Sequence, residues 1–209
     1  MKTLAIIGSG NLGQQIANFS ISDNHYDKVV FFDDFSKESN INGFKILGCV
    51  NNILEEYSNN AFDNLIIGVG YNHFKLRSDL YNYFYKIIPF GKIIHSSCYI
   101  DNNVTIKDGC VVYPRTVLDL NVIINENTII NNNCTISHDT IIGQNCFISP
   151  NAAIAGFVNI DSSCFIGINA TIIDNISIIK DTYIGAGTVV SRNILSSGVY
   201  VGNPMKKIK

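Results

Sequence analysis

The sequence predicts two parts with different folds: an α/β unit, followed by a parallel β-helix built from hexapeptide repeats. From Ile94 to Val190, every sixth residue is Ile, Val or Leu, and no insertion interrupts the series. Before that series, short apolar stretches alternate with helical ones, which is typical of a parallel sheet with crossover helices. Pro89-Phe90-Gly91 separates the two patterns. The predicted domains are therefore residues 1–91 and 92–209.

The α/β part is expected to be Rossmann-like but small. Its first apolar strand is followed by Gly8-Ser9-Gly10-Asn11-Leu12-Gly13 and then by a helix. Two further strands and two further helices follow in alternation. The predicted strands are 4–7, 28–32 and 64–69, and the predicted helices are 12–22, 53–57 and 74–85. About three strands amount to half of a full dinucleotide-binding sheet.

In the repeat part, the aliphatic residue of each hexad points into a triangular prism, and three hexads make one coil. Because the period never slips, no long loop should leave the prism between Ile100 and Val190. The residues that we expect to be buried on this basis include Ile136, Ile142, Ile154, Ile160 and Ile172. Five of the six cysteines occupy a hexad position for small inward side chains, two residues before a repeat aliphatic: Cys98, Cys110, Cys134, Cys146 and Cys164. They are predicted to be reduced packing residues, neither disulfides nor metal ligands.

Composition narrows the functional classes. The chain is 46% hydrophobic and 15% charged, with a formal net charge of −2. This balance gives no electrostatic reason to expect nucleic acid or an anionic membrane as a partner. No stretch approaches the roughly 20 apolar residues that span a bilayer. We expect a cytoplasmic protein.

The glycine loop predicts a nucleotide site. Gly8, Gly10 and Gly13 form a GxGxxG pattern between a strand and a helix, where backbone N–H groups can bind a diphosphate. Asp33 follows Gly13 by the interval at which dinucleotide enzymes place a ribose-binding acid. With so few strands, a single nucleotide fits better than NAD, and Asp33 and Asp34 would accept hydrogen bonds from a sugar or base edge. The alternative is a tight turn without a ligand.

His138 is the candidate catalytic residue. Its hexad position lies at a corner of the prism and is elsewhere filled mostly by outward polar residues, so the imidazole is expected to point outward. An ordinary imidazole, with a pKa of about 6.5, suits a general base at neutral pH. Asp139 can orient it and favour its protonated form. One coil later, Gly156 leaves space beside it for an elongated ligand. The alternative is a surface histidine without a function; a metal is not expected, because no second His or Cys shares this corner.

These motifs, taken together, resemble the NeuD/PglD-like sugar acyltransferases, a branch of the left-handed β-helix hexapeptide acyltransferases. The resemblance extends over essentially the whole chain. The matching stretches are Phe31-Phe32-Asp33-Asp34-Phe35, Gly68-Val69-Gly70, Ile94-His95-Ser96, Ile136-Ser137-His138-Asp139, Gly156, Phe165-Ile166-Gly167-Ile168-Asn169-Ala170 and Val201-Gly202-Asn203-Pro204.

The resemblance implies a homotrimer that binds acetyl-CoA in the groove between adjacent left-handed β-helices. It implies that His138 is the catalytic base and that Asp139 supports it. The implied contacts with a nucleotide-linked amino sugar come from Gly10, Asn11, Asp33, Asp34 and Gly70. The implied contacts with CoA come from Phe147, Ile168 and Ala186, and Gly156 lies beside them in the predicted cosubstrate site.

The chain departs from the family pattern at two positions. Relatives often have a histidine in the glycine loop, where this chain has Gly10-Asn11-Leu12-Gly13. Some relatives have a second histidine at the CoA, where this chain has Phe147.

The function implied is acetyl-CoA-dependent N-acetylation of a nucleotide-linked amino sugar for surface glycan biosynthesis. The expected sugar is a 4-amino-4,6-dideoxyhexose linked to UDP, dTDP or GDP, and the acetyl group moves directly without a metal. The alternatives are O-acetylation of a sugar or a sialic acid, a non-catalytic nucleotide-sugar sensor, and a nicotinamide-dependent oxidoreductase.

Overall fold

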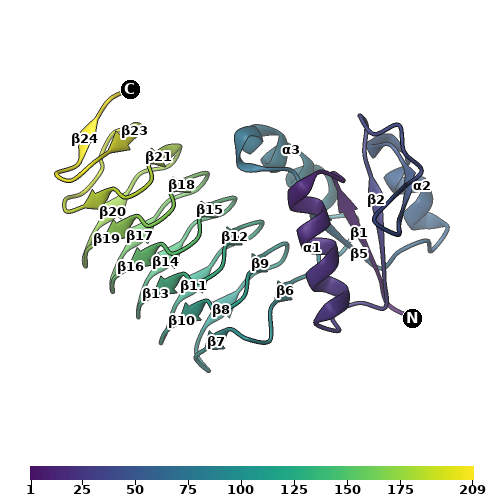
Figure 1. Cartoon of the computed structure of the whole chain (residues 1–209), viewed down its shortest axis with the longest axis horizontal. Helices are drawn as coiled ribbons and strands as arrows, with labels where there is room; N and C mark the ends of the chain where they lie inside the picture. The colour runs from purple at the N-terminus through teal and green to yellow at the C-terminus, as the bar shows by residue number, and fades with distance from the viewer. The chain divides into compact units, whose positions relative to one another are not determined.

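The computed structural model describes all residues, 1–209, as two compact units, Met1–Ile93 and Ile94–Lys209 (Figure 1). No helix in either unit combines the length and the apolar character needed to cross a membrane.

The first unit is built on one five-stranded sheet in the order β3-β4-β2-β1-β5. The strands are β1 Thr3–Ile7, β2 Lys28–Phe32, β3 Asn40–Ile41, β4 Phe44–Gly48 and β5 Asn64–Ile67. All neighbours pair in parallel except β3 and β4. Every side chain of β1 is buried, because this strand lies inside the sheet and both of its faces are covered.

The prediction of about three strands was wrong, because β3 and β4 form a hairpin that extends the sheet. Asn42 and Gly43 connect them with φ angles of 50° and 86°. Asn-Gly is the sequence that a two-residue hairpin turn favours, since both positions need positive φ. The signal was present in the sequence, but β3 is short and largely exposed, so it lacks an apolar pattern.

The helices of the first unit are α1 Asn11–Ser22, α2 Ile53–Ser58 and α3 Phe74–Phe84, with 3-10 turns η1 Val50–Asn52 and η2 Tyr71–His73. Helix α1 packs against β1 and β2, and α3 packs against β5. The order strand, glycine loop, helix therefore brings the N-terminus of α1 to the end of β1.

The second unit is a parallel β-helix whose coils each contribute one short strand to each of three sheets (Figure 1). The six-stranded sheet contains β7 Tyr99–Ile100, β10 Val117–Leu118, β13 Thr135–Ile136, β16 Ala153–Ile154, β19 Thr171–Ile172 and β22 Val189–Val190. The five-stranded sheet contains β8 Thr105–Ile106, β11 Ile123–Ile124, β14 Ile141–Ile142, β17 Asn159–Ile160 and β20 Ser177–Ile178. The eight-stranded sheet contains β6 Ile93–Ile94, β9 Val111–Val112, β12 Ile129–Ile130, β15 Phe147–Ile148, β18 Phe165–Ile166, β21 Thr182–Ile184, β23 Gly198–Val201 and β24 Lys206–Lys207.

The register predicted from the hexads is confirmed. Ile136, Ile142 and Ile160 are fully buried, and Ile154 and Ile172 are each 1% exposed. Strands pair between residues one coil apart, as Ile136 does with Ile154, so no long loop leaves the prism. Within the prism, Cys110, Cys134, Cys146 and Cys164 are buried free thiols, and Cys98 is half-buried.

The corners between strands depend on residues with left-handed backbone conformation. In each hexad between Asn121 and Asp181, one corner residue has a φ between 56° and 60°. Most of these residues are Asn, which tolerates this conformation better than other residues with a Cβ. The exceptions within this series include Asp139 and Phe157, which lie at the candidate catalytic corner.

Candidate functional site

The end of β1 and the end of β5 meet at three glycines of the first unit. A Cβ on Gly13 would collide with the carbonyl oxygen of Gly8, and a Cβ on Gly68 would lie 2.9 Å from the Cα of Gly13. Only glycine permits this close approach of the backbones. The approach fixes the path of the chain from β1 into α1.

Two further glycines, by contrast, have open surroundings at the same edge of the sheet. Gly10 caps α1 and Gly70 caps η2, and neither helical segment has a side-chain cap. A Cβ at either glycine would meet nothing within 4 Å. Asn11 is the first residue of α1 and is exposed. This arrangement leaves N-terminal backbone N–H groups available to an anion, as a diphosphate requires.

Both carboxylate oxygens of Asp33 are hydrogen-bonded to neighbouring loops of the protein. Its Oδ2 accepts hydrogen bonds from the N–H of Ser9 at 2.7 Å and from the hydroxyl of Ser9 at 2.6 Å. Its Oδ1 accepts from the N–H groups of Phe35 at 2.8 Å and Ser36 at 3.0 Å. Desolvation raises the pKa of this carboxyl, but the four hydrogen bonds outweigh it and hold the pKa below its usual value.

A carboxylate has about four lone-pair positions, and all of those on Asp33 are used. These four hydrogen bonds favour an indirect role for Asp33, and its contact with a sugar or base edge stays a prediction. Asp33 ties the glycine loop at Ser9 to the segment that begins at Phe35. The interval between Gly13 and Asp33 identified the residue, but it could not show which groups the carboxylate faces.

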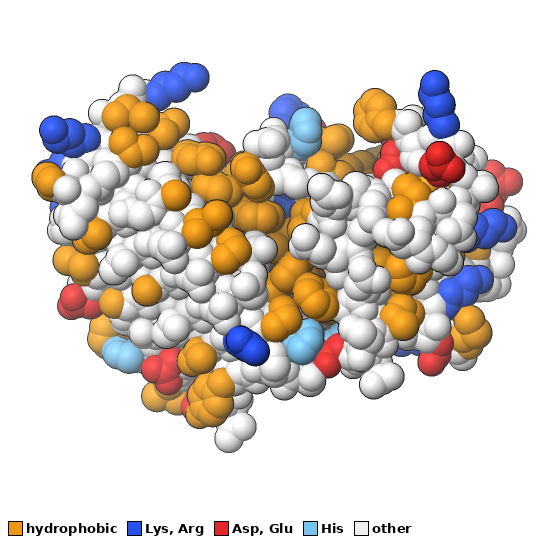
Figure 2. Space-filling view, viewed as in Figure 1, with side chains coloured by type: hydrophobic (Ala, Val, Ile, Leu, Met, Phe, Trp, Pro, Cys, Tyr) orange, Lys and Arg blue, Asp and Glu red, His pale blue; other side chains and the backbone are white.

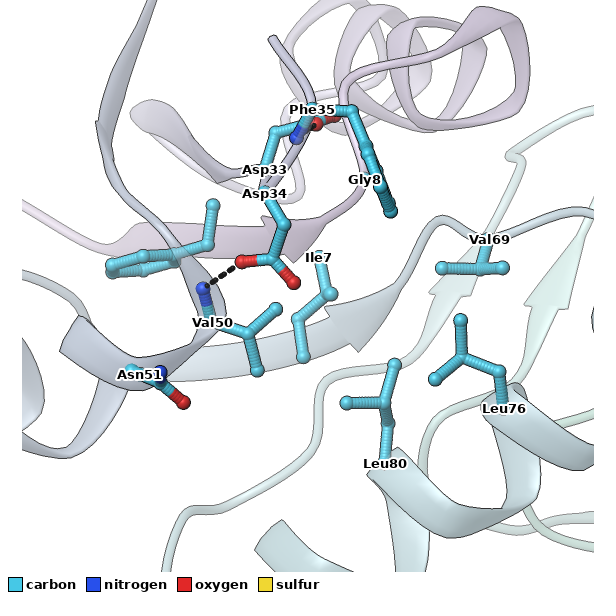
Figure 3. Close-up of a pocket in the computed structure, with 11 residues that line it drawn as sticks. Ile7, Gly8, Asp33, Asp34, Phe35, Val50, Asn51, Val69, Leu76 and Leu80 are labelled. Atoms are coloured by element: carbon cyan, nitrogen blue, oxygen red, sulfur yellow. Dashed lines mark hydrogen bonds between the residues drawn. The ribbon is translucent and has the colours of Figure 1, made fainter.

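Asp34 lines a cavity of about 260 Å³ next to the hydrogen bonds that Asp33 accepts (Figure 3). Its Oδ1 accepts a hydrogen bond from the N–H of Val50 at 2.8 Å. The ring of Phe35, which is 91% exposed, lies at the same cavity. The cavity is otherwise mostly apolar, and its lining residues are Ile7, Gly8, Phe32, Asp33, Asp34, Phe35, Val50, Asn51, Val69, Leu76 and Leu80. A mostly apolar slot beside the Asp34 carboxylate suits a flat heterocycle that presents an N–H group.

Arg77 is a residue of this region that the sequence analysis missed. Its side chain is fully buried, and its Nη1 donates hydrogen bonds to the carbonyl oxygens of Val69 at 2.6 Å and Ile67 at 3.4 Å. The guanidinium thus fixes the segment between β5 and Gly70 and adds positive charge behind it. Arg77 occupies the buried stripe of α3 together with Tyr81 and Phe84. A cation on that stripe is a sequence signal that could have been used.

His138 lies at the corner between β13 and β14, with its side chain 46% exposed. Its Nδ1 is 3.0 Å from Oδ2 of Asp139. Because an ionised carboxylate only accepts hydrogen bonds, Nδ1 is the protonated nitrogen and Nε2 of the neutral ring presents a lone pair. The pair therefore has the arrangement of a general base with an orienting acid.

The imidazole lies directly over Gly156. A Cβ at Gly156 would be 2.6 Å from Cε1 and 2.8 Å from Nε2 of His138. The space that we expected Gly156 to leave for a ligand is therefore occupied by the imidazole itself. Phe157 packs edge-on against the same ring, with 5.1 Å between ring centroids and an interplanar angle of 87°. Gly156 and Phe157 together fix the orientation of the ring.

The predicted CoA contacts do not lie together within one chain. Ile168 and Ala186 lie one coil apart on one long edge of the six-stranded sheet, at the corner where the chain enters it from the eight-stranded sheet. Both are exposed. His138 and Gly156 occupy the other edge of that sheet. Phe147 belongs to the eight-stranded sheet, is 7% exposed and stacks on Phe165.

Between the two edges, a shallow groove of about 400 Å³ crosses the six-stranded sheet. Small and β-branched residues line it: Thr135, Ser137, Ala153, Ile154, Ala155, Thr171, Ile172, Ile173 and Asp174. On the face drawn in Figure 2, charged side chains are scattered, and uncharged groups cover most of the surface.

No group of three or more His, Cys, Asp or Glu side chains converges in a geometry that could hold a metal ion.

Comparison with known families gives two matches. Residues 3–84 match the PglD N-terminal domain. Residues 121–156, which include His138 and Gly156, match the bacterial transferase hexapeptide (six repeats). No curated protein matches the chain at a significant level.

Solved structures give matches over the full length. The acetyltransferase domain of PglB from Neisseria gonorrhoeae is 25% identical with a TM-score of 0.91, and the match covers 100% of both chains. The same domain in complex with acetyl coenzyme A gives 25% identity, a TM-score of 0.91 and 99% coverage of each chain. PerB from Caulobacter crescentus, in complex with CoA and GDP-perosamine, is 24% identical with a TM-score of 0.90, covering 100% of this chain and 98% of that one.

Proposed function

Because the chain belongs to the NeuD/PglD-like sugar acyltransferases, with their α/β domain and left-handed β-helix, we propose that it acetylates a nucleotide-linked amino sugar with acetyl-CoA. The sugar that we propose is a 4-amino-4,6-dideoxyhexose. The observation that supports this most strongly is the outward His138–Asp139 pair on a β-helix corner. The structural neighbours with CoA, acetyl coenzyme A or GDP-perosamine support the same substrate classes.

The nucleotide would bind at the glycine edge of the first unit. The N–H groups at Gly10 and Gly70 would meet the diphosphate, and Asn11 would lie beside it. The base would enter the cavity beside Asp34, whose Oδ2 is directed into it in Figure 3. Asp33 would act on this site through Ser9 and Phe35, since its own oxygens are occupied.

The transfer itself needs one base. The neutral amine of the sugar attacks the thioester carbonyl carbon, and the C–N bond forms as Nε2 of His138 takes the amine proton. The C–S bond then breaks, and the CoA sulfur leaves as a thiolate that acquires a proton from the imidazolium or from water. Asp139 stabilises the imidazolium while it exists.

Direct transfer agrees with the placement of the cysteines. Cys134 and Cys146, which are the cysteines nearest to His138 in the chain, are fully buried inside the prism. Burial raises the pKa of the Cys134 thiol to about 12, and hydrogen bonds from Ala152 and Asn151 only partly oppose this shift. A buried neutral thiol is not a nucleophile, so an acyl-cysteine intermediate has no candidate here.

A homotrimer would complete the acetyl-CoA site. Ile168 and Ala186 lie on one edge of the six-stranded sheet, and His138 lies on the other. A groove formed by the edges of two neighbouring chains would bring both sets of residues to one ligand. The exposed small residues of the six-stranded sheet, Thr135, Ala153 and Thr171, leave room for such an approach.

The test of this proposal is CoA release from acetyl-CoA with UDP-, dTDP- and GDP-linked 4-amino-4,6-dideoxyhexoses, followed by mass spectrometry of the product. We expect one sugar nucleotide to gain one acetyl group in an alkali-stable amide. An alkali-labile ester would instead indicate O-acetylation. Binding of a sugar nucleotide without any release of CoA would indicate a sensor, and oxidation of NADH would indicate an oxidoreductase.

A further inference from the structure

One corner position of the β-helix recurs in every coil, eighteen residues apart, and passes through Asp139. From the second coil on, it holds Asn121, Asp139, Phe157 and Asn175, with φ angles of 59°, 56°, 57° and 59°. Asn is the ordinary residue for this left-handed turn. Asp139 and Phe157 are the exceptions, and both contact His138.

Asn121 has a specific side-chain contact one coil before the catalytic corner. Its Nδ2 donates a hydrogen bond to Oδ1 of Asp139 at 2.9 Å. The other oxygen of the same carboxylate, Oδ2, faces Nδ1 of His138 at 3.0 Å. Each oxygen of Asp139 therefore has one defined partner, and the plane of the carboxylate is fixed from the side away from the imidazole.

Asn175 shows that the turn conformation does not require this contact. It has the same corner position and the same φ as Asn121, but its Nδ2 bonds to the neighbouring Asp174 at 2.7 Å. Corner amides also bond to the next coil elsewhere, as Nδ2 of Asn127 does to Oδ1 of Asn145 at 3.0 Å. What distinguishes Asn121 is its acceptor, the carboxylate that faces His138. Without it, the carboxylate of Asp139, which is partly exposed, would be free to rotate away from Nδ1.

We propose that Asn121 is a positioning residue for the acetyl transfer, which acts through Asp139 to keep the proton of His138 on Nδ1 and the lone pair on Nε2. The inference rests on the proposed role of His138 as the base. Asn121 has no contact with the imidazole and is not required to touch either substrate. It holds the orienting acid, and the orienting acid selects the tautomer.

The test compares Asn121→Gly with Asn175→Gly, because glycine tolerates the left-handed conformation at both positions and the fold is preserved. We expect Asn121→Gly to lower kcat roughly tenfold, as the loss of one hydrogen bond to a charged group implies, with the KM of both substrates nearly unchanged. Asn175→Gly should keep the kcat of the unmodified chain. Asn121→Asp, which has the same shape but places a second carboxylate beside Asp139, should lower kcat at least as much.

A double-mutant cycle separates positioning from a general structural effect. In an Asp139→Asn background, Asn121→Gly should cause no further loss of kcat, because the residue through which it acts is already changed. An equal loss in both backgrounds would overturn the inference, and so would equal kcat values for Asn121→Gly and Asn175→Gly.

The imidazole tautomer gives a second readout that needs no catalysis. In ¹⁵N-histidine NMR at a pH where the ring is neutral, His138 should be protonated at Nδ1 in the unmodified chain and shift toward the Nε2–H form in Asn121→Gly. An unchanged tautomer in Asn121→Gly would contradict the inference even if His138 proved not to be the base. Full turnover in His138→Ala with a changed tautomer in Asn121→Gly would contradict the proposed function of His138 alone.

Discussion

His138 is fixed by neighbours that depart from the repeat around it. Phe157 is the clearest departure, because a bulky aromatic residue occupies a left-handed position with a φ of 57°. Such a conformation is costly for a residue other than Gly, Asn or Asp, and costs of this kind are concentrated at functional sites. The ring remains 55% exposed, so burial does not explain its presence. Its contact is with the imidazole.

This geometry predicts opposite effects of Phe157→Asn on stability and on activity. Asn occupies this corner position in two other coils, at Asn121 and Asn175. The change should therefore raise the free energy of unfolding by roughly 1 kcal/mol as backbone strain is removed. The imidazole would lose its edge-on partner, and kcat should fall. Urea unfolding and steady-state kinetics on the same preparation measure both effects. A variant that is less stable and fully active would show that the ring has neither role.

The pH dependence of the reaction should report the imidazole and not the carboxylate. Hydrogen bonds from Asn121 and then from His138 lower the pKa of Asp139 below its usual value, so this group stays ionised throughout the range in which imidazoles titrate. The value of kcat/KM should therefore fall on the acid side in a single step, as the base becomes protonated.

Replacement of Asp139 by Asn tests the same pair. A carboxylate beside the imidazole stabilises the imidazolium that forms when the amine proton is taken, so Asp139→Asn should lower kcat. Steady-state kinetics of both proteins measure this. An unchanged kcat in Asp139→Asn would mean that Asp139 does not act on the base.

At the scale of elements, Asp33 joins the glycine loop to the segment after β2 by hydrogen bonds. We expect Asp33→Ala to raise the KM for the sugar nucleotide and to leave the KM for acetyl-CoA nearly unchanged. The reason is indirect: the oxygens of Asp33 accept hydrogen bonds from Ser9, Phe35 and Ser36. Loss of these bonds should loosen the two segments that border the cavity proposed for the nucleotide.

Initial-rate kinetics with each substrate varied in turn provide the measurement. Asp27→Ala is a suitable control, since Asp27 accepts a hydrogen bond from the N–H of Lys2, at the opposite end of β1. If both KM values rise together in Asp33→Ala, the sugar-nucleotide site and the acetyl-CoA site are not separate in the way that we propose.

The elements differ in how much of their structure the sequence predicts. The hexad period determined the whole register of the β-helix, because one position in six must face the interior and a slip would expose it. The outward position of His138 followed from that register. The role of Asp33 did not follow from its spacing, since spacing does not show how a loop folds back onto a carboxylate. The hairpin of β3 and β4 and the buried position of Arg77 did have signals in the sequence, namely the Asn42-Gly43 turn and a cation on the buried stripe of α3. The hydrogen-bond partners of Arg77 did not, because they are set by tertiary contacts.

At the scale of the whole molecule, the separation of the residues proposed to contact acetyl-CoA predicts that the chain assembles with copies of itself. If Ile168 and Ala186 of one chain must meet His138 of a neighbouring chain, the active species is a homotrimer. Light scattering should give a mass three times that of the 23.1 kDa chain. Thr171→Arg, a charged substitution on the exposed face of the six-stranded sheet, should reduce assembly and CoA release together. A fully active monomer would contradict this part of the account.

The central claim is that the chain releases CoA from acetyl-CoA by transfer to an amino sugar, with His138 as the base. The measurement that tests it most directly is the turnover of His138→Ala and His138→Asn beside the unmodified chain, each in the same oligomeric state and with the sugar nucleotide that gives the fastest CoA release. We predict a loss of roughly 10²–10⁴-fold in both variants, the usual contribution of a positioned base, with little change in the free energy of unfolding, because this exposed side chain contributes little packing. Near-normal turnover in a folded His138→Ala protein would contradict the account.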